Sequence, residues 1–396
     1  MHDARTVQIG TILGNIADEL DISQELYDEM VEKYEHLGEW IKDDNEERFR
    51  TDSEIYTQGS VRLGTMIKPV KEDCEYDVDL VYRRELAKSG VTQEELVQSA
   101  GDQLERYIAY RKDEGLDEPE LVRRRRCWAL NYDGRLALYY DGRFHMDVIP
   151  AIPDDEPIKY GIELADTAIL ITDREQHEWQ HSNPKGYAEW FRSREREVFD
   201  RQIVSMAAAK KVDIESIPAE RVRTPLRRIV QILKRHRDIR YSGDPDDKPI
   251  SIIITTLAAS VYSNETELFS ALMSVVRKMP DAVQKTGGKW WIPNPVNPEE
   301  NFGDRWNEYP QRAERFFEWL GLVEADLSAA EQKTGIANFS ESLSPVFGGE
   351  VVRKSIERFG RSMDSAQQSG NLKMATGTGT LGSVGASIPK NTWFGD

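Results

Sequence analysis

YTQGSVRLGTMIKPVKEDCEYDVDLVYRRE, residues 56–85, is the stretch on which the fold of this chain depends. It holds a Gly-Ser pair and then acids at every second position, which are Asp73, Glu75, Asp77 and Asp79. Side chains two positions apart on a strand share one face, so a strand here would carry the acids on one side. Only the part from Tyr76 onward, YDVDLVY, is rich in β-formers, so Asp77 and Asp79 are the pair that a strand would hold most firmly.

Two carboxylates held close together raise each other's pKa unless a cation neutralises them. Mg²⁺ suits such a pair because it prefers hard oxygen ligands and is often completed by substrate phosphates. A two-metal site needs a third carboxylate, and Asp147 in RFHMDVIPAI offers one between apolar strand residues. We therefore expect two Mg²⁺ ions, with Mn²⁺ as a substitute, at Asp77, Asp79 and Asp147. Two alternatives stay open: a solvated acidic edge strand, and an Asp147 that is satisfied by an arginine of residues 123–126.

The segment QGS, which is Gln58, Gly59 and Ser60, precedes the acidic strand. A glycine lets the backbone approach a ligand closely, and a serine hydroxyl with free N–H groups at a helix start favours phosphate. The segment is therefore a candidate nucleotide-phosphate site. The alternative is a plain turn and helix cap.

Composition narrows the function classes. The chain has 396 residues, 39% of them hydrophobic, which is enough for two domains. A net charge of −18 argues against stable binding of long nucleic acids by general electrostatics. Two cysteines, Cys74 and Cys127, do not make a disulfide framework. The N-terminus has no signal-peptide pattern, and the most apolar run, from Pro249, is too short to span a membrane, so a cytoplasmic protein is expected.

Three regions differ in their patterns. Residues 1–182 combine helical segments, one with Ser23 or Asp21 as its cap and one with Thr92, with strands around the acids, which predicts a mixed α/β sheet. The pattern of residues 183–364 predicts an all-helical second domain. Residues 365–396 are rich in Gly, Ser and Thr, and we expect a flexible tail there.

The order of Gly-Ser, D-x-D on one strand and a lone Asp on a later strand resembles a nucleotidyltransferase of the polymerase-β type. Further segments, SNPKGYAEWF and RTPLRRIVQILKRHRD, are more specific. With them, residues 50–265 resemble the CD-NTases, bacterial relatives of cyclic GMP-AMP synthase. The resemblance implies an α+β fold, with a polymerase-β-type nucleotidyltransferase core and a helical second domain that completes a nucleotide cleft. It also implies synthesis of cyclic di- or trinucleotides from NTPs, ATP among them, which activate a separate effector in anti-phage defence.

The resemblance also assigns roles to particular residues. It implies that Asp77 and Asp79 hold both ions and that Asp147 completes the site and helps to deprotonate the attacking hydroxyl. It matches Lys234 and Ser251 to residues that contact the triphosphate. For Lys234 the alternative is a solvated basic helix.

Two other motifs have weaker claims. RRRRCW, from Arg123, is read as part of a strand whose arginines balance the acidic site, line the acceptor pocket, or simply face solvent. HEWQH, His177–His181, fits the zinc protease pattern H-E-x-x-H, but that pattern requires a helix and Pro184 follows at once. We therefore expect no zinc proteolysis.

The tail resembles those CD-NTase tails that dock to, or are conjugated by, a ubiquitin-activating-like partner. The candidate partner-binding residues are Trp393, Phe394 and Gly395, although the chain ends in Asp396 rather than in glycine. An idle tail is the alternative. For the whole chain, the competing functions are a nucleotidyltransferase that makes linear products or modifies RNA or protein, and a catalytically silent nucleotide-binding scaffold.

Overall fold

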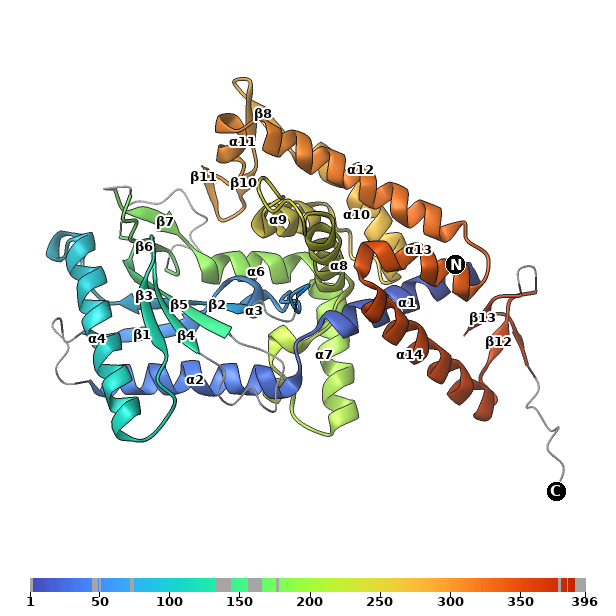
Figure 1. Cartoon of the computed structure of the whole chain (residues 1–396), viewed down its shortest axis with the longest axis horizontal. Helices are drawn as coiled ribbons and strands as arrows, with labels where there is room; N and C mark the ends of the chain where they lie inside the picture. The colour runs from blue at the N-terminus through green and yellow to red at the C-terminus, as the bar shows by residue number, and fades with distance from the viewer. Residues whose placement is uncertain are drawn as a thin grey trace. The chain divides into compact units, whose positions relative to one another are not determined.

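The computed structural model describes residues 3–44, 49, 51–71, 75–132, 144–155, 166–175, 178–376, 379–382 and 384–388. Its chain divides into two compact units (Figure 1). The sheet unit comprises Ile22–Ser193 and Pro293–Glu300. The helical unit comprises Met1–Asp21, Arg194–Ile292 and Asn301–Asp396.

A seven-stranded mixed sheet forms the centre of the sheet unit, as the sequence predicts. Its main path runs β1-β2-β5-β4-β3, and β6 and β7 continue from β5. Among the strands that the structure describes in this sheet, β2 and β5 pair in parallel and the other pairs are antiparallel. The strands are β1 (Ser53–Thr57), β2 (Tyr76–Arg84), β3 (Glu120–Arg123), β4 (Trp128–Tyr132), β5 (Phe144–Pro153), β6 (Ile169–Ile171) and β7 (Gln180–Ser182). Two further strands from a later segment of the chain, β10 (Pro293–Asn294) and β11 (Asn297–Asn301), form a separate two-stranded sheet.

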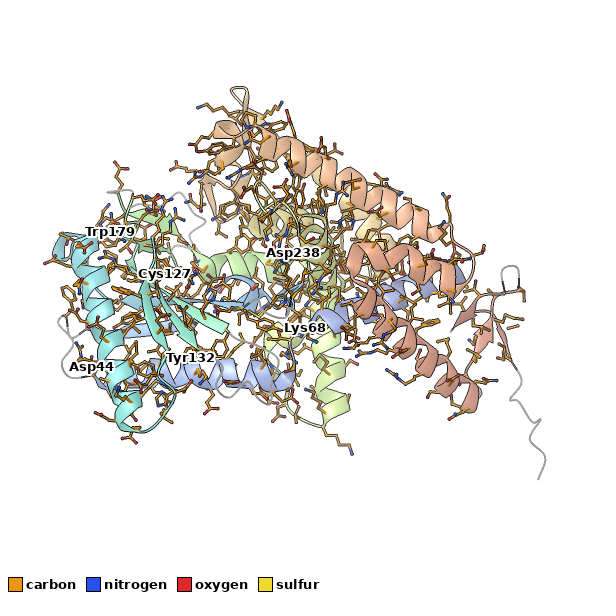
Figure 2. The ribbon with its side chains drawn as sticks, in the orientation of Figure 1. Asp44, Lys68, Cys127, Tyr132, Trp179 and Asp238 are labelled. Carbon is orange, nitrogen blue, oxygen red and sulfur yellow. The ribbon has the colours of Figure 1, made fainter. Side chains whose placement is uncertain are left out.

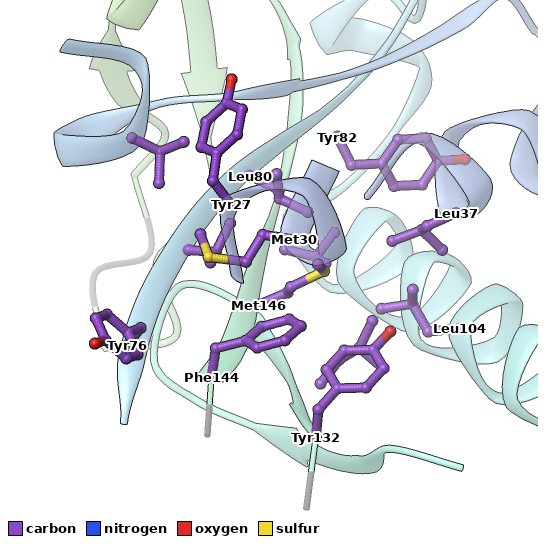
Figure 3. Packing of buried hydrophobic residues seen from close by; sticks show 14 of the residues in the cluster. Tyr27, Met30, Leu37, Tyr76, Leu80, Tyr82, Leu104, Tyr132, Phe144 and Met146 are labelled. Carbon is purple, nitrogen blue, oxygen red and sulfur yellow. The ribbon is translucent and has the colours of Figure 1, made fainter. Parts of the chain in front are cut away.

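The alternation of residues along β2 decides which face of the sheet is buried. Val78, Leu80 and Tyr82 are buried against α2 (Gln24–Asp43) and α4 (Gln93–Asp113), as Figure 3 shows for part of this core. The alternate residues, Asp77 and Asp79, therefore point away from that core. Two further helices of this unit are α3 (Gly59–Leu63) and α6 (Pro184–Arg194).

The expected helix caps are confirmed. The Ser23 side chain accepts a hydrogen bond from the Leu26 amide at the start of α2. Thr92 and Glu95 form a reciprocal capping box at the start of α4. These caps fix where the two helices that cover the buried face of the sheet begin.

The helical unit contains helices at both ends of the chain. Its helices are α1 (Ala4–Leu20), α7 (Arg196–Lys210), α8 (Pro225–Arg240), α9 (Ser251–Val261), α10 (Leu268–Ala282), α11 (Asp304–Glu308), α12 (Gln311–Glu331), α13 (Ile336–Phe347) and α14 (Gly349–Gln368). A hairpin of β8 (Gln284–Thr286) and β9 (Lys289–Trp291) interrupts them. No described helix is long and apolar enough to cross a membrane.

The first helix, α1, belongs to the helical unit, where it packs against α8, α10 and α14. The reason is its buried face, which includes Ile12, Leu13 and Ile16. The expected domain limits at 182/183 and 364/365 stay predictions.

The region expected to be a flexible tail begins inside α14, which ends at Gln368. Beyond it the described residues form three short antiparallel strands, β12 (Lys373–Met374), β13 (Leu381–Gly382) and β14 (Ala386–Ser387). Part of this region is therefore strand. Trp393, Phe394 and Gly395 lie outside the described residues.

Candidate active site

The parallel pairing of β2 with β5 brings the predicted acids together. In this register Asp79 lies opposite Asp147, and Asp77 lies opposite His145. Residues paired across neighbouring strands share a face of the sheet. Asp77, Asp79 and Asp147 thus stand on adjacent strands, on the face opposite the buried core.

A histidine completes this group of potential ligands. Ligand atoms of Asp77, His145 and Asp147 all lie within 4.8 Å of one another. The His145 Nε2 atom is 3.2 Å from Asp77 Oδ1, and its Nδ1 atom is 3.3 Å from Glu75 Oε2. Sequence reasoning missed His145, although its position two residues before Asp147 places both on one strand face. Asp73, the first acid of the series, lies outside the described residues.

The QGS segment lies next to Asp79. The Gln58 amide donates a 2.8 Å hydrogen bond to the Asp79 carbonyl, and α3 begins at Gly59. Gly59 has a φ of +59°, and a Cβ added there would lie 2.5 Å from Asp79 Oδ2. Glycine is therefore needed for the close approach of the Asp79 carboxylate and for a conformation that L-residues rarely adopt. Ser60, the next residue, is half-buried.

An arginine also contacts this site. Arg124 donates a 3.2 Å hydrogen bond to Asp147 Oδ2. One oxygen of Asp147 is therefore paired with an arginine, as the alternative interpretation expected. The second oxygen, Oδ1, is buried and accepts no hydrogen bond of ordinary geometry from the described residues. A buried carboxylate oxygen without a partner is costly, and a hard divalent cation would satisfy it. The residues present therefore fit a divalent metal ion.

The pKa values of several groups at this site are raised by burial and by neighbouring carboxylates. Burial, with the Asp77 carboxylate adding to it, raises the pKa of Asp147, while Arg124 and His145 oppose the shift. The hydrogen bond to Asp77 raises the pKa of His145. Burial and then Asp147 raise the pKa of the nearby Cys127 thiol, which therefore stays neutral. Oxygen and imidazole, rather than thiolate, are the ligands that this site offers.

The predicted triphosphate residues lie in the helical unit. Lys234 is on α8 and is buried, and Ser251 is the first residue of α9. Arg237 donates hydrogen bonds to Ser251 Oγ at 2.8 Å and to the Pro249 carbonyl at 3.0 Å. Arg237 lies three residues after Lys234 and so on the same side of α8. Sequence reasoning missed this cation, although it stands in the KRHR run.

The structure corrects the interpretation of residues 123–126 as part of a strand. β3 ends at Arg123 and β4 begins at Trp128. Between them the chain turns, and the Arg124 amide donates to the Cys127 carbonyl. The physical reason is that a turn points the arginines in different directions, so that Arg123 pairs with Glu94, Arg124 with Asp147, and Arg125 and Arg126 with Asp173.

The zinc protease pattern is not realised in the described residues. His181 lies on the strand β7, not on a helix, and its Nδ1 atom is 2.6 Å from Asp154 Oδ2. His177 lies outside the described residues. His181 thus pairs with a buried carboxylate, as a structural histidine does.

Known proteins resemble this chain in sequence and in fold. Residues 53–149 match the family model of the nucleotidyltransferase domain of DncV-like cyclic GMP-AMP synthase. A c-di-GMP synthase of Roseivirga ehrenbergii is 29% identical over 98% of both chains. The cyclic dinucleotide synthase CdnG of Bradyrhizobium diazoefficiens is 24% identical over 96% of this chain and 92% of that protein.

Solved structures agree in fold. The Bradyrhizobium diazoefficiens CdnG structure with GTP has a TM-score of 0.67 at 23% identity, covering 89% of this chain and 99% of that one. CdnC of E. coli MS115-1, solved in complex with a HORMA protein, has a TM-score of 0.59 at 13% identity, covering 85% and 96%. Together with the matching family model and the full-length relatives, this likeness shows that the chain has the CD-NTase fold and that residues 53–149 resemble the nucleotidyltransferase domain of cyclic dinucleotide synthases.

Proposed function

We propose that this chain joins nucleoside triphosphates into a cyclic di- or trinucleotide and releases pyrophosphate. The observation that supports this most is the register of β2 and β5, which sets Asp79 beside Asp147 and Asp77 within ligand distance of Asp147. The adjacent QGS segment gives the site a place for phosphates. Asp77, Asp79 and Asp147 are the catalytic and metal-binding residues of this proposal.

Each group of residues has a separate task. Asp77, Asp79 and Asp147 would hold two Mg²⁺ ions, for which Mn²⁺ would substitute, and the bound ions would supply neutralisation of phosphate charge. Gln58, Gly59 and Ser60 position the β- and γ-phosphates of the donor nucleotide, while Lys234 and Ser251 contact its triphosphate. Positioning and charge neutralisation account for most catalysis of phosphoryl transfer.

The chemistry balances within two successive transfers. A ribose hydroxyl oxygen of one nucleotide attacks the α-phosphorus of another, a new P–O bond forms, and the bond to the β-phosphate breaks as pyrophosphate leaves. Asp147, the nearest base to the attacking oxygen in this proposal, accepts the hydroxyl proton. A second transfer within the linear intermediate closes the ring and releases a second pyrophosphate.

The partners follow from this chemistry. NTPs, with ATP among them, are the substrates, and the cytoplasm is where they are abundant. The cyclic product activates a separate effector protein in anti-phage defence. The CdnC:HORMA complex shows that a similarly folded protein binds a protein partner.

A ubiquitin-activating-like protein is the proposed partner of Trp393, Phe394 and Gly395. Deletion of residues 391–396 should abolish its capture in a pull-down, while substitution of the exposed Lys210 to Ala should not. Equal capture by the deleted chain would contradict a tail-binding partner.

The test is incubation with labelled NTPs and Mg²⁺ or Mn²⁺, followed by phosphatase and mass spectrometry. A phosphatase-resistant product with the mass of a cyclic oligonucleotide is expected. A product with phosphatase-sensitive ends would instead support the linear nucleotidyltransferase. No product from any NTP mixture, with nucleotide binding retained, would support the silent scaffold.

A further inference from the structure

A pocket lies within the sheet unit and adjoins the acid face at Arg124 and Cys127. Its volume is about 560 Å³, within the range of small-molecule sites. Three segments line it: the start of α4 around Thr92, the turn between β3 and β4, and the residues that follow β6. Trp179 also lines the pocket, and Figure 2 labels it together with Cys127, another lining residue.

The pocket is strongly basic in an otherwise acidic chain. Its basic lining residues are Lys88, Arg123, Arg124, Arg125, Arg126 and Arg174. Among the described residues, two acids, Glu94 and Asp173, line it with them. The net charge of the lining is therefore positive, whereas the chain carries −18. A positive concave surface of this kind concentrates anions.

Ion pairs fix the walls of the pocket. Asp173, whose side chain is fully buried, accepts hydrogen bonds from Arg125 Nε at 2.8 Å and from Arg126 Nε at 2.7 Å. Arg123 makes a two-pronged pair with Glu94 on α4. The pocket is thus held open by charge pairs on three elements, which favours a preformed site.

Several hydrogen-bond donors that line the pocket take no part in these ion pairs. Arg126 uses only Nε, so its two terminal nitrogens have no partner among the described residues. The Arg174 side chain is exposed and makes no hydrogen bond or ion pair within the described part of the chain. Planar guanidinium groups are well suited to phosphate oxygens.

A buried hydroxyl supplies independent support. Thr172 is only 2% exposed, lines the pocket, and its Oγ1 atom has no hydrogen-bond partner in the described structure. Buried polar groups without partners are rare and costly, and a ligand oxygen would satisfy this one. Trp179 packs on the apolar cluster that contains Val91, so its ring is a fixed surface for a flat group.

The pocket lies mainly on the reverse side of the sheet from the catalytic acids. In the β4–β5 register Trp128 pairs with Val148, while Ala129 pairs with Asp147, so Trp128 faces away from the acids. Trp128 Nε1 donates to the Val97 carbonyl of α4, the helix that forms one wall of the pocket. Arg124 and Cys127 are the lining residues that also stand beside Asp147.

We propose that this pocket is a second nucleotide-binding site, separate from the substrate site. The phosphate binds Arg126, Arg174 and the Thr172 hydroxyl, and the base stacks on Trp179. This inference does not depend on the proposed catalytic activity, because no metal-binding residue takes part in it.

Calorimetric titration tests the pocket without interference from the acid face. The full chain with Asp77→Asn and Asp79→Asn is titrated with AMP, GMP and inorganic pyrophosphate in EDTA. We expect AMP or GMP to bind more tightly than pyrophosphate, because only a nucleotide reaches Trp179. No binding, or pyrophosphate binding as tight as that of either nucleotide, would overturn the proposal.

Two substitutions of exposed residues, which should leave the fold intact, test whether the nucleotide binds in this pocket. Arg174→Ala removes a side chain that makes no hydrogen bond or ion pair among the described residues, and we expect at least a tenfold loss of nucleotide affinity. Lys210→Ala, which removes an exposed charge elsewhere, should change affinity less than twofold. Equal losses in both variants would show general charge attraction and overturn the site.

The variant Thr172→Val distinguishes a binding role of the hydroxyl from a structural role, because the two roles predict different changes in affinity and in Tm. It removes the unpartnered hydroxyl at nearly constant volume, so Tm should stay equal or rise. Nucleotide affinity should fall several-fold because the phosphate loses a donor. Unchanged affinity in this variant would contradict the role of Thr172 and the placement of the phosphate.

Discussion

Asp147 is the residue on which the active-site proposal depends. One of its oxygens pairs with Arg124 and the other is buried without an ordinary hydrogen bond. Sequence reasoning weighed an arginine partner against a metal ion as exclusive alternatives. In the structure Arg124 binds one oxygen and leaves the other without such a partner among the described residues, so an arginine and a metal ion are not exclusive alternatives.

Removal of the acid pair should stop synthesis. In Asp77→Asn with Asp79→Asn, the loss of two negative ligands should reduce product formation by more than about a thousandfold, in line with loss of catalytic metal binding. Circular dichroism should remain native because both side chains lie off the buried face. Asp102→Asn, an exposed change on α4, is the control and should retain activity. Normal turnover by the double variant would remove the metal assignment.

Gly59 and Gly115 form a matched pair for the QGS segment. Both have positive φ values, +59° and +70°, but only a Cβ at Gly59 would collide with Asp79, while nothing lies near Gly115. Gly115→Ala should lower the free energy of unfolding by about 1 kcal/mol, the cost of the backbone conformation alone. Gly59→Ala should cost more and also reduce activity at least tenfold. Urea denaturation and product assays measure both, and equal effects would show that Asp79 does not require the glycine.

The strands that carry the acids could be predicted from their sequence, because β2 alternates and β5 is apolar around Asp147. The turn at Arg124–Cys127 could not be predicted, because a run of consecutive arginines has no apolar side that would show whether it is strand or turn. His145 and Arg237 also escaped prediction. Their relevance comes from the atoms beside them, Asp77 Oδ1 and Ser251 Oγ, which only the fold brings near.

A buried ion pair between Arg227 and Glu195 stabilises helix α8, which carries Lys234. Arg227 and Glu195 are 2% and 0% exposed, 2.7 Å apart, and Thr224 also donates to Glu195. Arg227→Met leaves a buried carboxylate unpaired and should lower the free energy of unfolding by about 3–5 kcal/mol. Arg353→Met breaks an exposed pair with Glu357 and should cost less than about 0.5 kcal/mol. Similar costs in denaturant titrations would show that the buried pair does not anchor α8.

Asp117 links α2 and α4 and gives stability a pH dependence. Burial alone would raise its pKa, but hydrogen bonds and charges from Lys33 and Arg111 lower the pKa below its ordinary value. The folded pKa is lower than the unfolded one, so this stabilisation is present above about pH 4 and is lost as pH falls through the folded value. Asp117→Asn should therefore lower Tm by roughly 2 °C at pH 7, and the gap from the wild type should close below about pH 4. A constant gap across this range, or an equal effect of the exposed Asp113→Asn, would contradict the linkage.

The division of the chain was predicted only in outline. A mixed sheet region followed by helices is visible in the residue patterns, and the resemblance to the CD-NTases implied the fold that the comparisons show. The placement of α1 with α14 joins residues more than 300 positions apart, and an amphipathic helix does not reveal which partner it covers. The same limit applies to the basic pocket, since its arginines, Thr172 and Trp179 come together only through the sheet.

The most direct measurement is a crystal structure with Mn²⁺ and a non-hydrolysable NTP, in which anomalous scattering locates the ions. We predict manganese peaks bonded to oxygens of all three carboxylates, with Asp147 Oδ1 among the ligands. Peaks elsewhere, or an Asp147 that contacts only Arg124 while nucleotide is bound, would contradict the account.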